Sequence, residues 1–287
     1  MNAWFTEEQT RDMRLSLRVR SLLHRERSGY QEIAVYETAE VGRLLVLDDV
    51  IMTSERDEFG YHEMISHVAL CTHPAPRRVL IIGGGDGGTL REVARHREVE
   101  EIHMVEIDER VIEVSRRFLP SIAAAFDDPR LRLHIDDGIE YVRAAAEKGD
   151  RYDVILCDST DPVGPAAGLF SADFFRNAAA ALGEEGLYAA QTESPYFNRE
   201  LLSGVQRDLR EAFGRSYLYL SAVPTYPGGL WSFSMGSKGP DPTGAELHFE
   251  RVEGMPLRFY SPEVHRAAFA LPPFVRELLP GEARGAR

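Results

Sequence analysis

Apolar and polar positions alternate in two different ways along the chain. From residue 13 to residue 54 the apolar residues alternate with polar ones in short runs, and turn signals separate the runs at 28–29, 41–42 and 48–49. Alternation with a period of two is typical of half-buried strands. We therefore predict a small antiparallel β domain, which acts as a dimerisation or lid module or contacts the substrate. Its strands are expected in the runs 14–19, 32–36, 43–47 and 50–52.

A helix at 57–70, capped by Ser54 or Asp57, is predicted next. From residue 79 compact apolar runs alternate with helical patterns, which favours an α/β fold with a mostly parallel, seven-stranded sheet and helices on both faces. We predict a domain boundary between residues 72 and 73, with a catalytic domain and C-terminal extension over 73–287. The predicted strands are 79–82, 102–105, 131–135, 153–157, 186–191, 217–223 and 230–236, the last two as an antiparallel pair; the predicted helices are 88–97, 109–118, 138–147, 171–182 and 199–213.

Composition narrows the class of protein. A formal net charge of −13 over 287 residues argues against a nucleic-acid partner, because phosphate contacts need clustered Lys and Arg. No apolar run is long enough to span a membrane and no secretion signal is recognised, so we expect a cytoplasmic protein. Cys71 and Cys157 lack metal-ligand spacing, and His62 and His67 lie five residues apart instead of the four that a zinc helix requires.

A glycine-rich loop is the first candidate for chemistry. The apolar run 79–82 leads into the loop 83–88, which matches G-x-G-x-x-G, and Glu106 ends the next apolar run. This is the pattern of a dinucleotide site, with the carboxylate on the ribose. Asp86 inside the loop argues against that, because it would repel a pyrophosphate and attract a cationic nucleoside. The loop therefore predicts a site for a sulfonium nucleoside.

More carboxylates fall where predicted strands end. Glu106, Asp137 and Asp158 occupy such positions, and Asp161 follows shortly after. The carboxyl ends of the strands of a doubly wound sheet meet at one crevice, and so acidic a crevice calls for a cationic ligand. Asp158 and Asp161 have the spacing for a metal but no His or Cys cluster nearby, and a polyamine would use them equally well. Aromatic residues that could flank an aliphatic cation are Tyr61, Tyr196, Tyr226 and Trp231, although each is individually more often a core residue.

A series of ordered motifs then points to a family. The motifs are Tyr30-Gln31, Leu47-Asp48-Asp49-Val50, the runs 53–64 and 83–88, Val105-Glu106-Ile107-Asp108, Asp136-Asp137-Gly138, the run 158–165, Gln191-Thr192-Glu193-Ser194-Pro195 and Pro224-Thr225-Tyr226-Pro227. Together they resemble the spermidine synthase family of polyamine aminopropyltransferases, over about residues 4–238 and again over 259–265. The resemblance implies a methyltransferase-like Rossmann domain behind the β domain. It also implies transfer of the aminopropyl group of decarboxylated S-adenosylmethionine to putrescine, giving spermidine and 5′-methylthioadenosine.

The resemblance also implies roles for individual residues. Asp158 stands in the position of the proton acceptor. The donor and methylthioadenosine positions are Gln31, Asp86, Glu106, Asp137, Gly138 and Pro165. The polyamine positions are His62, Asp86, Asp158 and Asp161, to which residue chemistry adds Tyr61, Gln191, Glu193, Tyr226 and Trp231. Asp49, Met52 and Tyr196 stand where many members carry Gly, Gln and Trp.

Several alternatives stay open at this point. The acceptor is putrescine, agmatine or cadaverine, and the assembly is a homodimer or a homotetramer. The same motifs also fit a methyltransferase that uses intact S-adenosylmethionine, or a polyamine sensor without activity. The first of these has a donor carboxylate that Asp86 and Asp158 would repel. No metal or cofactor is expected, since the sulfonium of the donor is already electrophilic.

Overall fold

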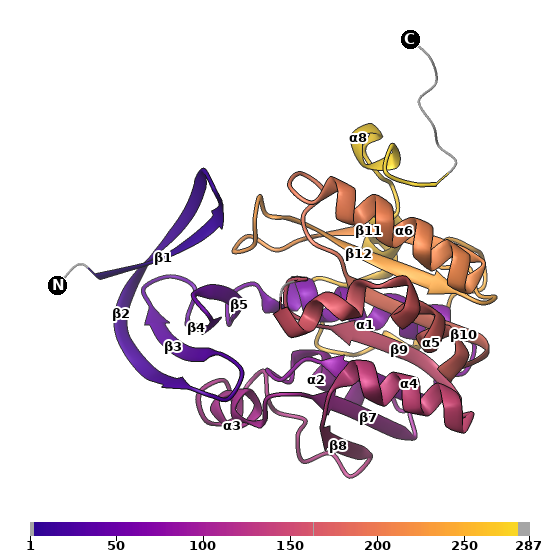
Figure 1. Cartoon of the computed structure of the whole chain (residues 1–287), viewed down its shortest axis with the longest axis horizontal. Helices are drawn as coiled ribbons and strands as arrows, with labels where there is room; N and C mark the ends of the chain where they lie inside the picture. Colours follow the sequence, from indigo (N-terminus) through magenta and orange to yellow (C-terminus); the bar gives the residue numbers. More distant parts are fainter. Residues whose placement is uncertain (1–2, 163, 281–287) are drawn as a thin grey trace.

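A computed structural model describes residues 3–162 and 164–280 as two sheets joined by a helix (Figure 1). The small sheet contains β1 (Ala3–Thr10), β2 (Met13–Arg27), β3 (Glu32–Thr38), β4 (Arg43–Leu47) and β5 (Val50–Ser54), each antiparallel to the next. The sequence predicted four of these strands but missed β1. Residues 6–10 are all polar, so nothing alternates there, and β2 provides the partner residues from Ala3↔Val19 to Thr10↔Met13.

The large sheet confirms the predicted fold class. Its order is β11-β12-β10-β9-β6-β7-β8; β10 to β8 are parallel, and β12 near the other edge is antiparallel to both of its neighbours, β10 and β11. The predicted antiparallel pair is therefore correct. The strands are β6 (Arg78–Gly83), β7 (Glu101–Glu106), β8 (Leu131–Ile135), β9 (Tyr152–Asp158), β10 (Leu182–Gln191), β11 (Arg215–Ala222) and β12 (Leu230–Ser237).

Helices cover both faces of the large sheet and form a hydrophobic core on each. On one face α1 (Glu58–Thr72) and α2 (Gly88–Ala94) share a core with the C-terminal segment. On the other face lie α4 (Gly138–Lys148), α5 (Ala172–Ala181) and α6 (Arg199–Phe213). The structure adds four short helices that the sequence analysis did not predict: η1 (Gly164–Phe170), η2 (Phe249–Val252), α7 (Pro262–Ala268) and α8 (Pro273–Arg276). None of the described helices is both long and apolar enough to cross a bilayer.

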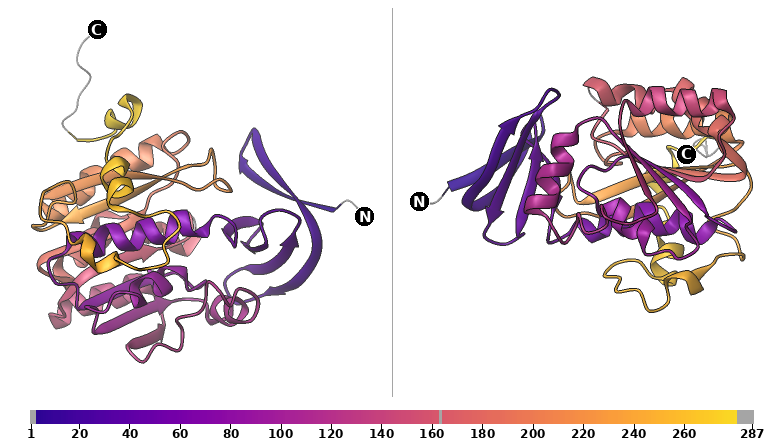
Figure 2. Two further views of the ribbon diagram at one scale, coloured as in Figure 1. Left: turned by 180° about the vertical axis from the view of Figure 1, so that it is seen from behind. Right: turned by 90° about the horizontal axis from the view of Figure 1, so that it is seen from below.

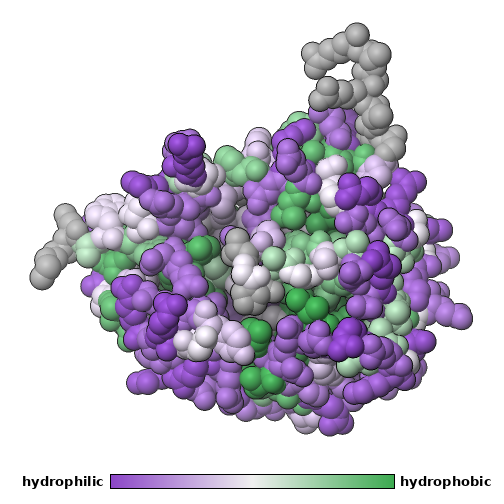
Figure 3. Space-filling view, viewed as in Figure 1, coloured by the Kyte–Doolittle hydropathy of each residue, from purple (hydrophilic) through white to green (hydrophobic). Residues whose placement is uncertain are grey.

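The helix α3 (Glu109–Phe118), which follows β7 of the large sheet, packs against the small sheet (Figure 2). Its apolar side packs on the inner face of the small sheet, where Val111 and Val114 share a core with Ile33, Val35 and Leu45. The predicted division between residues 72 and 73 stays a prediction, and α1 packs on the large sheet. On the face in Figure 3 hydrophilic residues cover most of the surface, and hydrophobic residues gather toward the middle.

A buried glutamate attaches the C-terminal segment to α1. The carboxylate of Glu63 accepts hydrogen bonds from the backbone N–H groups of Arg258, Phe259 and Tyr260 at 2.7–2.9 Å. Three amides satisfy the charge of a carboxylate that is 1% exposed. The segment 258–260 is thereby held against α1, the helix that carries Tyr61 and His62.

Candidate active site

A cavity of about 310 Å³ lies between the carboxyl ends of the large sheet and the small sheet. The β4–β5 hairpin forms one wall with Leu45, Leu47, Asp48, Val50 and Met52. The opposite wall consists of strand ends and loops of the large sheet: 82–86, 105–107, 137–139 and 158–161. The predicted convergence of Glu106, Asp137 and Asp158 on one crevice is therefore seen in the structure, with Asp86 and Asp161 in the same wall.

The glycine loop adopts a backbone that side chains would obstruct. Gly83, Gly84 and Gly87 have φ values of 77°, 74° and 87°. A Cβ at Gly83 would lie 2.2 Å from the carbonyl oxygen of Asp158, and the N–H of Gly84 donates to that oxygen at 2.8 Å. The loop is thus packed against the end of β9. Asp86 turns back on the loop, where its Oδ1 accepts from the N–H of Gly88 at 2.8 Å.

The donor positions lie at the junction of the two sheets. Burial raises the pKa of Glu106 to about 7, although backbone N–H groups, including that of Asp108 at 2.9 Å, oppose the shift. The side chain of Gln31 reaches across from the small sheet and donates to Asp108 Oδ2 at 2.9 Å, beside Ser28 Oγ at 2.6 Å. Sequence reasoning did not find Ser28 or Asp108 as partners of Gln31, because nothing in the spacing relates β3 to α3.

The adenine positions are set by the start of α4. Asp137 is its N-cap, where Oδ1 accepts from the N–H of Ile139 at 2.8 Å, and Gly138 follows as the first residue. Both line the cavity. Pro165 falls in η1, and its side chain lies outside the described part of the chain.

Two hydroxyls fix the carboxylate of Asp158. Tyr61 Oη donates to Oδ1 and Thr89 Oγ1 donates to Oδ2, both at 2.7 Å. Burial and the nearby charge of Asp86 raise the pKa of Asp158, while the two hydroxyls and His62 oppose the rise. Sequence reasoning named Tyr61 but missed Thr89, although Thr89 directly follows the glycine loop, where the first turn of α2 faces the strand ends.

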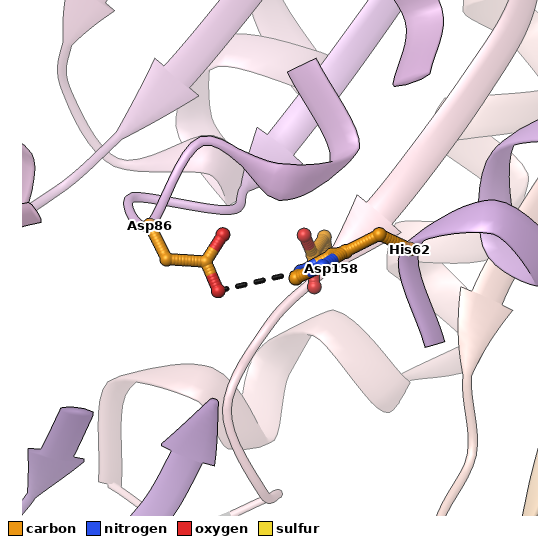
Figure 4. A group of neighbouring side chains, drawn as sticks. All are labelled: His62, Asp86 and Asp158. Atoms are coloured by element: carbon orange, nitrogen blue, oxygen red, sulfur yellow. Dashed lines mark ion pairs between the residues drawn. The ribbon is translucent and has the colours of Figure 1, made fainter. Parts of the chain in front are cut away.

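His62 lies between the carboxylates of Glu58 and Asp86, and Figure 4 shows its ion pair with Asp86. Its Nδ1 is 2.7 Å from Glu58 Oε2 and its Nε2 is 3.3 Å from Asp86 Oδ2. Burial alone would lower the pKa of His62, but Asp86 and Glu58 outweigh it and raise the pKa well above its usual value. Nitrogen atoms that both face carboxylates carry protons and have no lone pair for a metal. His62, Asp86 and Asp158 nevertheless have ligand atoms within 4.8 Å of one another, so the expectation that no metal takes part stays a prediction.

The predicted polyamine residues do not all reach the cavity. Tyr61, Asp161 and Tyr226 line it, and the hydroxyl of Tyr226 donates to the carbonyl of Met52 in the hairpin. Gln191 and Trp231 lie behind this wall: Gln191 donates to the carbonyl of Ser159 at 3.2 Å, and Trp231 packs on Tyr226 with ring centroids 4.6 Å apart. Their roles in binding stay predictions.

Two further candidates lie away from the wall. Glu193 is buried behind Asp161, and burial, together with the charge of Asp161, raises its pKa. Its Oε2 accepts from Asn198 Nδ2 at 3.0 Å. Tyr196 is 55% exposed and stacks on Phe274, so it does not face the cavity.

His67, the second histidine of the rejected zinc pattern, is buried against Glu92 and His96.

Family models, curated relatives and solved structures of polyamine aminopropyltransferases, including spermidine synthases, resemble this chain. The family described as "Spermine/spermidine synthase domain" matches residues 58–244, and "Spermidine synthase tetramerisation domain" matches residues 3–55. The polyamine aminopropyltransferase of Moorella thermoacetica is 52% identical over 276 residues, 96% of each chain, and that of Bacillus subtilis is 46% identical over 276 residues, 96% of this chain and 98% of the other. Among solved structures, spermidine synthase in complex with the transition state analogue AdoDATO superposes with a TM-score of 0.92 at 40% identity, over 96% of this chain and 94% of the other. Spermidine synthase from Thermotoga maritima gives 0.91 at 40% identity, over 97% and 94%.

Proposed function

This chain belongs to the spermine/spermidine synthase family and is a polyamine aminopropyltransferase, and we propose that its own reaction joins decarboxylated S-adenosylmethionine to putrescine. The products would be spermidine and 5′-methylthioadenosine. The observation that carries the proposal is the charge of the cavity wall. Asp86, Asp158 and Asp161 face one space that both substrates, as cations, would fill.

The donor would occupy the part of the cavity next to the glycine loop. Glu106 would accept from the ribose hydroxyls, Asp137 and Gly138 would bind the adenine, and Gln31 and Pro165 would contact the methylthioadenosine. Asp86 would hold the primary ammonium of the aminopropyl arm and so orient it. The same carboxylate disfavours intact S-adenosylmethionine, whose carboxylate would come close to it. This electrostatic difference supports aminopropyl transfer over methyl transfer.

Asp158 would act as the proton acceptor. One amine of putrescine attacks the methylene carbon next to the sulfonium, and a C–N bond forms as the C–S bond breaks. The electron pair of the broken bond stays on sulfur, which becomes the neutral thioether of methylthioadenosine. The amine loses a proton to Asp158, directly or through water, and the raised pKa of this carboxyl makes it a better base. The scheme uses no metal or cofactor, because the leaving group is already activated.

The far amine of the acceptor would bind at Asp161, with Glu193 and Gln191 behind it. The rings of Tyr61 and Tyr226 line the cavity beside Asp158 and would contact the methylenes, with Trp231 supporting Tyr226. Putrescine fits a site with two anchors at a fixed distance, whereas a shorter diamine cannot reach both and a longer one has to bend. Agmatine is the competing acceptor, because its guanidinium pairs well with a carboxylate.

We also propose a cytoplasmic homo-oligomer. The match to a tetramerisation domain covers the small sheet, where Trp4 is 59% and Leu22 is 49% exposed. The free, buried Cys71 and Cys157 agree with a reducing compartment. Light scattering of the purified protein distinguishes a monomer, a dimer and a tetramer.

Product analysis tests the reaction. Purified protein is mixed with decarboxylated or intact S-adenosylmethionine and with propanediamine, putrescine, cadaverine or agmatine, and the products are identified by mass spectrometry. We expect methylthioadenosine and spermidine, and a drop of about 10²–10⁴-fold in turnover for Asp158→Asn. Asp173→Asn, a change at an exposed residue of α5, is the control. S-adenosylhomocysteine as the product, or no product, would refute the proposal; faster turnover of agmatine would change only the acceptor.

A further inference from the structure

A line of alternating charges runs from the cavity into the interface between α1 and α2. Asp86 Oδ2 faces His62 Nε2 at 3.3 Å, and His62 Nδ1 faces Glu58 Oε2 at 2.7 Å. The same Glu58 oxygen accepts from Arg91 Nη2 at 2.7 Å, and Arg91 Nε continues the line to Glu92 Oε1 at 2.8 Å. Only the first two residues of this line border the cavity.

Burying these charged side chains costs hydration free energy, so their buried positions need an explanation. The side chains of Glu58 and His62 are 7% and 3% exposed, and Glu92 is fully buried. A buried ion pair rarely adds stability over an apolar contact of the same size. The backbone also makes room for the arrangement: a Cβ at Gly88 would lie 2.2 Å from the ring of His62. The glycine at the start of α2 therefore lets the imidazole reach Asp86.

We infer that Glu58, held by Arg91, is a positioning residue for the aminopropyl transfer: it fixes the ring of His62 so that Nε2 faces Asp86, where the donor's ammonium is to bind. The inference rests on the proposed function, and it adds two residues to which the family resemblance assigned no role and which do not line the cavity. Sequence reasoning named Tyr61 and His62 in the predicted helix 57–70 but gave Glu58 no role. The spacing of Glu58 and His62, four residues apart on α1, could have suggested the pair.

The geometry dictates what Glu58 does to the ring. An imidazole can rotate about its bond to Cβ and can carry its proton on either nitrogen. The carboxylate of Glu58 removes both freedoms, because it requires a proton on Nδ1 and a ring orientation that points Nε2 into the cavity. Arg91 in turn binds Glu58 and donates to the carbonyl of Ser121 at 3.1 Å, so the carboxylate cannot turn toward another partner.

The ring also carries a charge that Glu58 maintains. The charged and titratable groups around His62 are Glu58 and Tyr61 from α1, Asp86 from the glycine loop, Asp158 from the end of β9 and, through Glu58, Arg91 from α2. Three of the five are carboxylates. With both nitrogens facing carboxylates, the ring is an imidazolium in the empty enzyme, and it balances part of the negative charge until the cationic substrates arrive.

Steady-state kinetics of Glu58→Gln test the inference. The variant keeps the shape but loses the charge, and we expect the KM for the donor to rise by about tenfold or more, with a smaller change in the KM for putrescine. Glu63→Gln is the matched control, because Glu63 is a buried glutamate of the same helix that faces the C-terminal segment instead of His62. In a His62→Gln background, Glu58→Gln should add less than about twofold, since the two residues act as a unit.

Nuclear magnetic resonance of the His62 ring gives a second measurement that does not depend on activity. In the native enzyme both ring nitrogens should stay protonated from pH 6 to 8, whereas in Glu58→Gln the ring should titrate within this range. A neutral His62 in the native enzyme at pH 7 would overturn the inference, even if Glu58→Gln failed to fold. Native kinetics in Glu58→Gln would also overturn it while leaving aminopropyl transfer in place. Absence of methylthioadenosine from the native enzyme would instead refute the proposed function.

Discussion

Replacing Thr89 by valine should move the acid limb of the pH profile to higher pH. The hydroxyl of Thr89 is fully buried and donates to Asp158 Oδ2 at 2.7 Å, and valine has the same shape without the donor. A hydrogen bond to a carboxylate stabilises its ionised form, so Thr89 holds the pKa of Asp158 below the value that burial and Asp86 would otherwise impose. Removing the donor therefore raises the pKa of Asp158 further. Since Asp158 accepts a proton only when ionised, activity is lost at a higher pH than in the native enzyme.

The size of the shift follows from the two bonds on Asp158. Tyr61 still donates to Oδ1, so half of the hydrogen bonding to the carboxylate is kept. A hydrogen bond to a buried charge contributes about 1.5–3 kcal/mol, and one pKa unit corresponds to about 1.4 kcal/mol. The acid limb should thus move up by about one to two pH units. Within this limb kcat/KM should fall by about ten- to a hundredfold at a fixed pH, and well above it the rate should be almost native.

The assay is kcat/KM for putrescine between pH 5 and 9 at saturating donor. Thr89→Ser is the matched control, because it keeps the hydroxyl and should keep the native limb. A limb that stays in place in Thr89→Val, or that moves to lower pH, would refute the argument. A uniform loss of rate at every pH would show that Thr89 matters for packing and not for the proton affinity of Asp158.

Two more predictions concern the hairpin and the donor site. Asp49 has a φ of 64° in the turn between β4 and β5, and this backbone conformation costs an aspartate more free energy than a glycine. Asp49→Gly should therefore raise the free energy of unfolding by about 0.5–1 kcal/mol in urea titrations. An unchanged or lower stability would contradict the argument that this turn is strained. Burial raises the pKa of Glu106 to about 7, so protonation at lower pH removes a hydrogen-bond acceptor. Calorimetry should therefore find that methylthioadenosine binds more weakly as the pH falls through 7, and that Glu106→Gln abolishes this pH dependence; a pH-dependent Glu106→Gln would assign the effect to another group.

The elements that sequence reasoning predicted share a strong local signal. The alternation of apolar runs with helical patterns predicted the large sheet, the antiparallel pair β11 and β12, and the helices on its faces. The ends of parallel strands meet by topology alone, which is why Glu106, Asp137 and Asp158 could be brought together without coordinates. The turns of the small sheet were also local, and Asp48-Asp49 indeed occupies a two-residue connection between β4 and β5.

What sequence reasoning missed depends on contacts between distant segments. β1 has no alternation of its own and is a strand because β2 pairs with it. The role of α3 as a link between the two sheets depends on which helix faces the small sheet, and neither its length nor its pattern says so. Gln191 and Trp231 were predicted to bind the polyamine, and both lie behind the cavity wall, on strands β10 and β12; which strand residues border the cavity depends on how distant segments pack around it.

The two walls of the cavity belong to separate stretches of the chain. Asp86, Asp158 and Asp161 belong to the large sheet, whereas the apolar side chains of Leu45, Leu47, Val50 and Met52 come from the hairpin, to which Tyr226 is hydrogen-bonded at Met52. The wall that carries the proposed proton acceptor and the apolar wall opposite it can therefore be substituted independently. A protein engineer who seeks a longer or bulkier amine acceptor can diversify this hairpin alone, because the proposed reaction assigns proton transfer to Asp158 on the opposite wall.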